Sequence, residues 1–142
     1  MSISQVRTYF KSRLSETDSD FREWTDGFNR ENIPNNIYDK AYHIAYGSLA
    51  SSALSDNFIE DNLSVSIQLF FKGYRDPAQA IDDALDKAHN FRLRCVSFPN
   101  ATTGDDIKNV ILTTMIPDFP ESNDNMIIID LEFVVRLCFD CI

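Results

Sequence analysis

The last long apolar run of the chain, Met126 to Asp140, constrains the fold more than any other segment. Apolar side chains occupy every second position of this run, and charged side chains fall only on the positions between them. The apolar set is Ile127, Ile129, Leu131, Phe133, Val135, Leu137 and Phe139; the other set contains Asp130, Glu132, Arg136 and Asp140 together with Met126, Ile128, Val134 and Cys138. This alternation predicts a β-strand with one buried face.

The length of this predicted strand is unusual. At roughly 3.3 Å per residue it would span about 46 Å, whereas typical strands end at about 20 Å. We therefore expect either a bulge within the strand or a strand that extends beyond its own subunit. The second arrangement would expose backbone groups that a neighbouring copy can pair, which favours assembly over catalysis.

The two helical segments near the start of the chain are predicted from the spacing of apolar residues. A first helix is expected to end at about Leu14. The aromatic residues between Phe21 and Phe28 predict a short helix or turn that ends near Gly27. The residues that follow, 29–38, are expected to form a loop because they contain Pro34 and repeated asparagines.

Alternation and capping residues predict the rest of the secondary structure. Strands are expected at residues 40–48, 63–72, 91–95 and 110–116, with a polar connector at residues 48–62. Asp76, Pro77 and Gln79 form a helix-start signal, so a helix is expected from Asp76 to about Asn90. The link between the last two strands is short, which predicts that they are antiparallel.

Together these elements predict a single α+β domain over residues 1–142. We expect a sandwich-like arrangement: a mixed, largely antiparallel sheet of four to five strands, with helices packed on it and a long C-terminal β-hairpin. The chain has no apolar stretch of membrane-spanning length and no apolar leader, so a soluble protein made in the cytoplasm, without a membrane partner, is expected.

The net charge of −9 argues against a sequence-independent hold on nucleic acid, which requires cations that neutralise phosphates. An acidic surface fits a conduit through which DNA slides, and it equally fits a small protein kept soluble by charge. The three cysteines, Cys95, Cys138 and Cys141, lie in apolar segments and are interpreted as small buried side chains rather than zinc ligands.

No pattern of catalytic residues stands out. The two histidines, His43 and His89, are interpreted as structural, and the phosphate-binding, nucleophile-elbow and zinc-protease motifs are missing from the sequence. Asp82 and Asp83 point about 100° apart on a helix, so they do not converge on one substrate atom. We therefore expect neither an enzyme nor a cofactor or metal.

The loop PDFPESNDN, residues 117–125, is the segment most suggestive of binding. It holds Phe119 between two prolines and among acidic side chains, which either presents the ring to a partner or lets it fold back onto the core. The candidate interface residues are Asp118, Phe119, Glu121 and Asp124 from this loop, with Asp130, Glu132 and Arg136 from the polar face of the terminal strand.

The order of elements, with SVSIQLFFKGYRDPAQAIDDALDKA (residues 64–88) at its centre, resembles the tail terminator, or tail completion, proteins of long-tailed bacteriophages. The resemblance extends over most of the chain and includes NIPNNIYDKAYHI at residues 32–44. It implies a homo-hexameric ring in the virion, at the head-proximal end of the tail, assembled in the host cytoplasm. Such a ring ends tube polymerisation, binds the tail tube protein and a neck or head-completion protein, and lets DNA pass through its lumen without specific binding.

Two alternatives remain at the level of sequence. A head-to-tail adaptor, or neck subunit, would bind the portal side instead of tube protein. A small α/β enzyme or ligand-binding domain would need a pocket that gathers residues such as His43, Tyr46 and Arg94.

Overall fold

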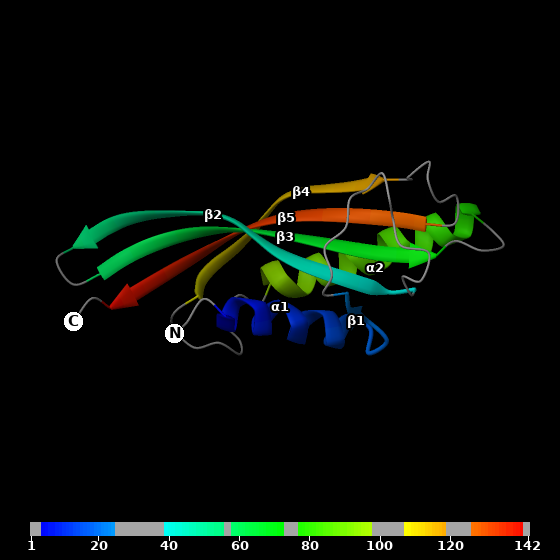
Figure 1. The fold of residues 1–142 in the computed structure, drawn as a ribbon, viewed down its shortest axis with the longest axis horizontal. Coiled ribbons are helices and arrows are strands. Elements are labelled where there is room, and N and C mark those ends of the chain that lie inside the picture. Colours follow the sequence, from blue (N-terminus) through cyan, green and yellow to red (C-terminus); the bar gives the residue numbers. More distant parts are fainter. Residues whose placement is uncertain are drawn as a thin grey trace.

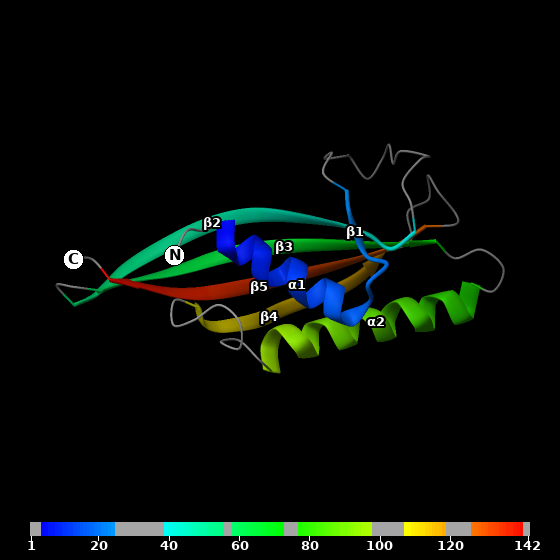
Figure 2. The ribbon, with the colours of Figure 1, turned by 90° about the horizontal axis from the view of Figure 1, so that it is seen from below.

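The computed structural model describes residues 4–24, 39–55, 58–72, 77–97, 107–118 and 126–140. In these residues two helices lie on one face of a five-stranded sheet (Figures 1 and 2). The elements are α1 (Ser4–Thr17), β1 (Arg22–Glu23), β2 (Ala41–Ser55), β3 (Phe58–Lys72), α2 (Pro77–Ser97), β4 (Ile107–Asp118) and β5 (Met126–Asp140). The strand order is β1-β2-β3-β5-β4; β1 is parallel to β2, and the other neighbours are antiparallel. The predicted α+β class and mixed, largely antiparallel sheet are confirmed.

The terminal strand has its predicted bounds but not its predicted place. β5 lies inside the sheet, where it pairs with β3 along its whole length and with β4 from Leu137 to Ile128. The prediction that this strand offers its own edge to a neighbour is therefore wrong. The bulges lie in β2 and β4, while the β3–β5 register runs without a shift.

The main core lies between the helices and the sheet. α1 buries Val6, Phe10 and Leu14 at helical spacing, and β5 buries its odd-numbered residues from Ile127 to Leu137 on the same side. A second, smaller cluster covers part of the opposite face and contains Ala41, Phe70, Met126 and Ile128, with Trp24 packed against it. β5 is therefore apolar on both faces at its N-terminal end, as central strands with two covered faces are.

Three predictions about the first half of the chain need correction. α1 continues to Thr17 rather than ending at Leu14. Residues 22 and 23 form the strand β1, not an aromatic helix or turn, because their backbone pairs with Ala41 and Tyr42. The predicted connector at residues 48–62 consists instead of the long ends of β2 and β3, which form a hairpin paired as far as Ser55 and Phe58.

The predicted strand at residues 91–95 is also wrong, because these residues belong to α2. Phe91 and Cys95 fit both an alternating pattern and a helical spacing of four. In the structure they continue the buried stripe begun by Ala84 and Ala88. The predicted turn at residues 99–105 and most of the 117–125 loop lie outside the described residues.

Candidate assembly surface

In the described part of the chain, one face of the sheet carries no helix (Figure 1). The even-numbered residues of β5 from Met126 to Arg136 lie on this face, because the odd-numbered ones face the helices. Asp130 and Glu132 are half-buried there, and Arg136 is exposed. Ser66 Oγ on β3 donates a hydrogen bond of 2.9 Å to Glu132 Oε1. Thr113 Oγ1 on β4 donates one of 3.0 Å to the Glu132 carbonyl. The Glu132 carboxylate is thus tied to a neighbouring strand.

The structure brings four of the seven predicted interface residues onto this helix-free face. Asp118 stands at the end of β4 opposite Ile128, a position that shares its face with Asp130, Glu132 and Arg136. The other three predicted residues, Phe119, Glu121 and Asp124, lie outside the described residues.

Sequence reasoning missed the apolar side chains on this face. Ile111 is 48% exposed and Ile116 is 54% exposed, and both lie on the helix-free side of β4. Strict alternation placed Ile116 on the same side as Val110, which is fully buried against the helices. A register shift between Leu112 and Thr114 inserts one residue into β4. Before the shift the even-numbered residues of β4 face the helices, and after it the even-numbered residues lie on the helix-free face.

The outer edges of the sheet are formed by β4 on one side and, on the other, by the two-residue strand β1 and the part of β2 that β1 leaves uncovered (Figure 1). At the start of β2 the edge is covered: β1 pairs with Ala41 and Tyr42, and Arg7 Nη1 donates a hydrogen bond of 3.3 Å to the Ile44 carbonyl. Beyond this point, no strand of the described residues pairs with the outer edge of β2 at residues 47–55 or of β4 at residues 109–117. We call these two segments the β2 edge and the β4 edge.

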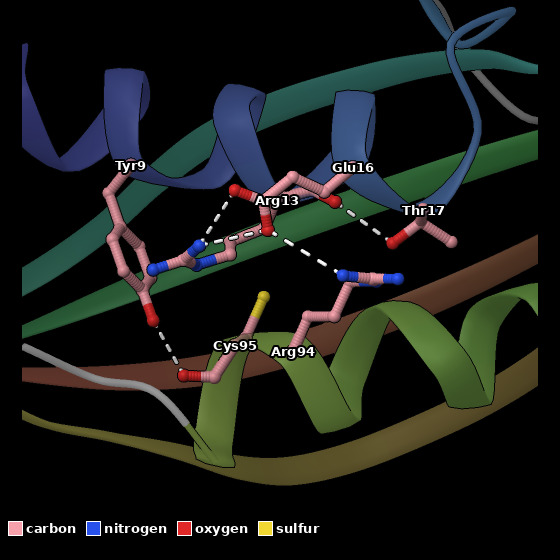
Figure 3. A network of polar contacts seen from close by, with 6 residues as sticks. All are labelled: Tyr9, Arg13, Glu16, Thr17, Arg94 and Cys95. Carbon is pink, nitrogen blue, oxygen red and sulfur yellow. Dashed lines mark hydrogen bonds and ion pairs between the residues drawn. The ribbon is translucent and has the colours of Figure 1, made fainter. Parts of the chain in front are cut away.

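A polar network fixes the two helices to each other (Figure 3). Tyr9 Oη donates a hydrogen bond of 2.6 Å to the Cys95 carbonyl near the end of α2. The Arg13 guanidinium lies 4.9 Å from the centre of the Tyr9 ring and contacts Glu16 Oε1 at 2.9 Å. Glu16 Oε2 is in turn 3.7 Å from Arg94 Nη1. The network holds the helices at a fixed position over the sheet.

The Tyr9 and Cys95 side chains of this network are held in their protonated forms, which suits a role in joining the two helices. Burial raises the pKa of the Cys95 thiol, so this side chain stays protonated and is a poor nucleophile. Burial also raises the pKa of Tyr9, whose hydroxyl remains a hydrogen-bond donor.

A cavity of about 540 Å³ lies where α2 faces the ends of β2 and β3. Its lining includes lysines and aspartates in equal number: Lys40, Lys72, Lys87, Asp39, Asp83 and Asp86. Lys87 Nζ and Lys40 Nζ lie 2.6 Å and 3.0 Å from Asp18 Oδ2. The hydrogen bond from Lys87 is the main reason that the pKa of Asp18 lies well below its ordinary value. This ion-pair cluster joins the end of α1 to β2 and α2.

The residues suggested for an enzyme pocket do not meet. His43 lies on the helix-free side of β2, with Nδ1 2.9 Å from the Trp24 carbonyl, whereas Tyr46 packs on the helix side. Arg94 stands on α2 beside Glu16. In the described part of the chain, no three His, Cys, Asp or Glu side chains are grouped so that they would hold a metal ion. Neither described helix is long and apolar enough to cross a membrane.

Comparison with known proteins gives a likeness of fold. No protein-family model matches this sequence, and no curated protein matches it either. Among solved structures, a chain from the structure described as "Virion of native gene transfer agent (GTA) particle" is similar, with a TM-score of 0.54 and 12% sequence identity over 92% of each chain. At this level of identity the likeness establishes a shared fold over nearly the whole length.

Proposed function

We propose that this chain is a structural protein of a phage-type virion, and that it caps the head-proximal end of the tail tube as a ring. The observation that carries the proposal is the fold shared with a chain of a gene transfer agent virion over 92% of both chains. The resemblance of the element order to tail terminator proteins supports the more specific role. In this role the ring ends tube polymerisation and offers a docking surface to a neck or head-completion protein.

The described surface fits a protein whose function is to bind other proteins. A net charge of −9 disfavours adhesion of DNA to the protein, which suits a passage through which DNA slides. The helix-free face combines the carboxylates of Asp118, Asp130 and Glu132 with the exposed apolar side chains of Ile111 and Ile116. A surface of mixed polar and apolar character is typical of protein–protein contacts.

The mechanism of such a cap is differential affinity. One surface of the ring must match the last ring of the tube, while the other must fail to accept further tube protein and instead fit the neck. Ring formation itself needs head-to-tail contacts between identical subunits, because contacts between identical patches close after two copies.

The test measures both assembly and capping. The mass of the purified protein is determined by light scattering, and the protein is then added to polymerising tail-tube protein encoded in the same genome. A ring-sized oligomer that shortens the tubes and sits at one tube end in electron micrographs supports the proposal. A strict monomer that neither binds tubes nor limits their growth contradicts it. Rings that do not bind tail-tube protein but bind the portal side of the neck would identify a neck adaptor instead.

The loop at residues 117–125 gives a second test. Replacing residues 119–125 by a glycine-serine linker of the same length, which leaves Pro117 and Asp118 paired in β4, is expected to impair assembly while the circular dichroism spectrum of the monomer stays unchanged, because Phe119, Glu121 and Asp124 are proposed contact residues. A linker variant that caps tubes normally would remove the loop from the proposed interface.

A further inference from the structure

We infer that copies of this chain join by continuing the sheet: the β4 edge of one copy pairs antiparallel with the β2 edge of the next. This inference rests on the proposed ring-forming function and specifies how the ring closes. It differs from the arrangement expected from sequence, in which the terminal strand itself was to be completed by a neighbour.

The distribution of charge among the strands is the first observation that carries the inference. Edge strands of monomeric sheets are usually protected by charged side chains or proline, because their unpaired backbone groups attract other strands. In this sheet most of the charges lie in the central strands instead: Glu60, Asp61 and Lys72 in β3, and Asp130, Glu132, Arg136 and Asp140 in β5. The edge strand β2 contains neither Asp, Glu, Lys nor Arg, and β4 carries its charges, Lys108 and Asp118, only at or next to its two ends. Between these ends the β4 edge, NVILTTMIP, is uncharged and has its one proline, Pro117, at the last position, and the β2 edge, GSLASSALS, contains neither a charged residue nor a proline.

Exposed apolar side chains mark the same two edges. Leu49 on the β2 edge is 45% exposed, and Ile111 and Ile116 on the β4 edge are 48% and 54% exposed. These are three of the five exposed large apolar side chains found among the described residues. An uncharged edge with exposed β-branched or aliphatic residues is the usual signature of a strand that pairs with another chain.

Electrostatics favour a second copy as the occupant. Each copy carries a net charge of −9, so the repulsion between two copies is smallest when the surfaces in contact carry no charge. The β2 edge and the β4 edge are two such surfaces. A contact between two different edges is head-to-tail, and repetition of that contact generates a ring when the rotation between successive copies closes.

Strand direction is compatible with repetition. The four long strands alternate in direction across each subunit, in the order β2, β3, β5, β4. Because four is an even number, β4 of one copy runs opposite to β2 of the next when all copies point the same way. Every subunit boundary then has the antiparallel geometry found inside the subunit, and the alternation is preserved around a closed ring.

The register inside the subunit shows which residues would meet. Ser48 Oγ lies 3.5 Å from Ser64 Oγ, Ser64 pairs with Val134, and Val134 pairs with Ile111. These four residues form one row across the helix-free face, from one edge to the other. If neighbouring copies join without an offset along the strands, Ile111 of one copy lies beside Ser48 of the next, and Ile116 lies beside His43, close to the part of β2 that β1 covers. Shifting one copy along the strands brings Thr114 or Ile116 beside Ser48 instead, and the shift to Ile116 pairs the whole β4 edge with the whole β2 edge.

Disulfide trapping tests the pairing directly. A double variant that combines Ser48→Cys with Ile111→Cys, Thr114→Cys or Ile116→Cys is oxidised at the concentration at which the full-length protein forms rings. We expect a ladder of covalent oligomers on a non-reducing gel for one of the three double variants. The single variants should give no ladder, and the wild-type protein controls for its own three cysteines.

The outcomes separate this inference from the proposed function. Rings that cap tubes but yield no ladder from any of the three double variants would overturn the edge pairing and leave the proposed function standing. Covalent dimers from Ile111→Cys alone would also overturn it, since they indicate two β4 edges related by a twofold axis. If no oligomer forms with or without tubes, the proposed function is contradicted, and the edge pairing that rests on it is overturned with it.

A charge substitution provides a second, independent test with a matched control. Ile111→Lys places the usual protective charge of an edge strand on the β4 edge, and pairing would bury that charge. We expect ring association to weaken by roughly tenfold or more. Leu93→Lys is the control, because Leu93 is 43% exposed but lies on α2, away from the sheet edges. If both variants assemble alike, the β4 edge does not carry the contact.

Discussion

Phe133 connects both helices to the sheet, and its truncation is expected to be the most destabilising single change among the aromatic residues of the core. The side chain is 1% exposed on β5. Its ring centre lies 5.1 Å from that of Phe10 on α1 and 6.0 Å from that of Phe91 on α2. Phe133→Ala should lower the free energy of unfolding by about 3–5 kcal/mol, because it removes buried apolar surface, leaves a cavity and abolishes both aromatic contacts.

Phe133→Leu separates these contributions. Leucine fills most of the cavity but cannot make the two aromatic contacts, so the expected loss is about 1–2 kcal/mol. Urea unfolding followed by circular dichroism measures both values, with a constant denaturant slope as the check on two-state behaviour. Leu93→Ala, at a position 43% exposed on α2, should change stability by less than about 0.5 kcal/mol. A loss below about 1.5 kcal/mol for Phe133→Ala would refute the view that this side chain holds the two layers together.

Three further predictions concern the polar contacts. Tyr9→Phe removes the 2.6 Å hydrogen bond to the Cys95 carbonyl and should cost about 1–2 kcal/mol in urea unfolding; an unchanged midpoint would show that the bond is dispensable. Lys40 has a φ of 58°, in the left-handed region, so Lys40→Gly should be more stable than Lys40→Ala by roughly 1 kcal/mol, although both lose the ion pair with Asp18. The folded-state pKa of Asp18 is lowered by Lys87 and lies below its unfolded value of 3.8, so its contribution is complete above that pH and is lost as the pH falls below it. Asp18→Asn should therefore reduce stability at pH 7 more than at pH 2.5, and an equal reduction at both would contradict the assignment.

The strength of the local signals explains which elements were predictable. The bounds of β5 follow from sequence because a strand between two others must keep its apolar set on one face over its whole length, and this leaves a long unbroken alternation. The start of α2 follows from Asp76 and Pro77 at its beginning. Its end did not, because Phe91 and Cys95 satisfy two periods at once, and only their packing beside Ala88 selects the helix.

The candidate interface residues were predictable only in part. Asp130, Glu132 and Arg136 share a face because of simple alternation along one strand. The exposure of Ile116 depends on a bulge in β4, and a single inserted residue leaves no mark in the alternation of NVILTTMI. Pairing of β2 beyond Ser48 was missed because its small, uncharged residues carry almost no strand signal of their own.

The sequence by itself determined the class of fold, the direction of the last two strands and the acidic balance of the chain, since these depend on local periodicity, a short link and a count of charges. Tertiary structure alone decided the order of the strands, and with it which strands became the edges. Strand order results from pairing between segments far apart in the chain, and the alternating pattern of β5 is compatible with either an edge or a central position.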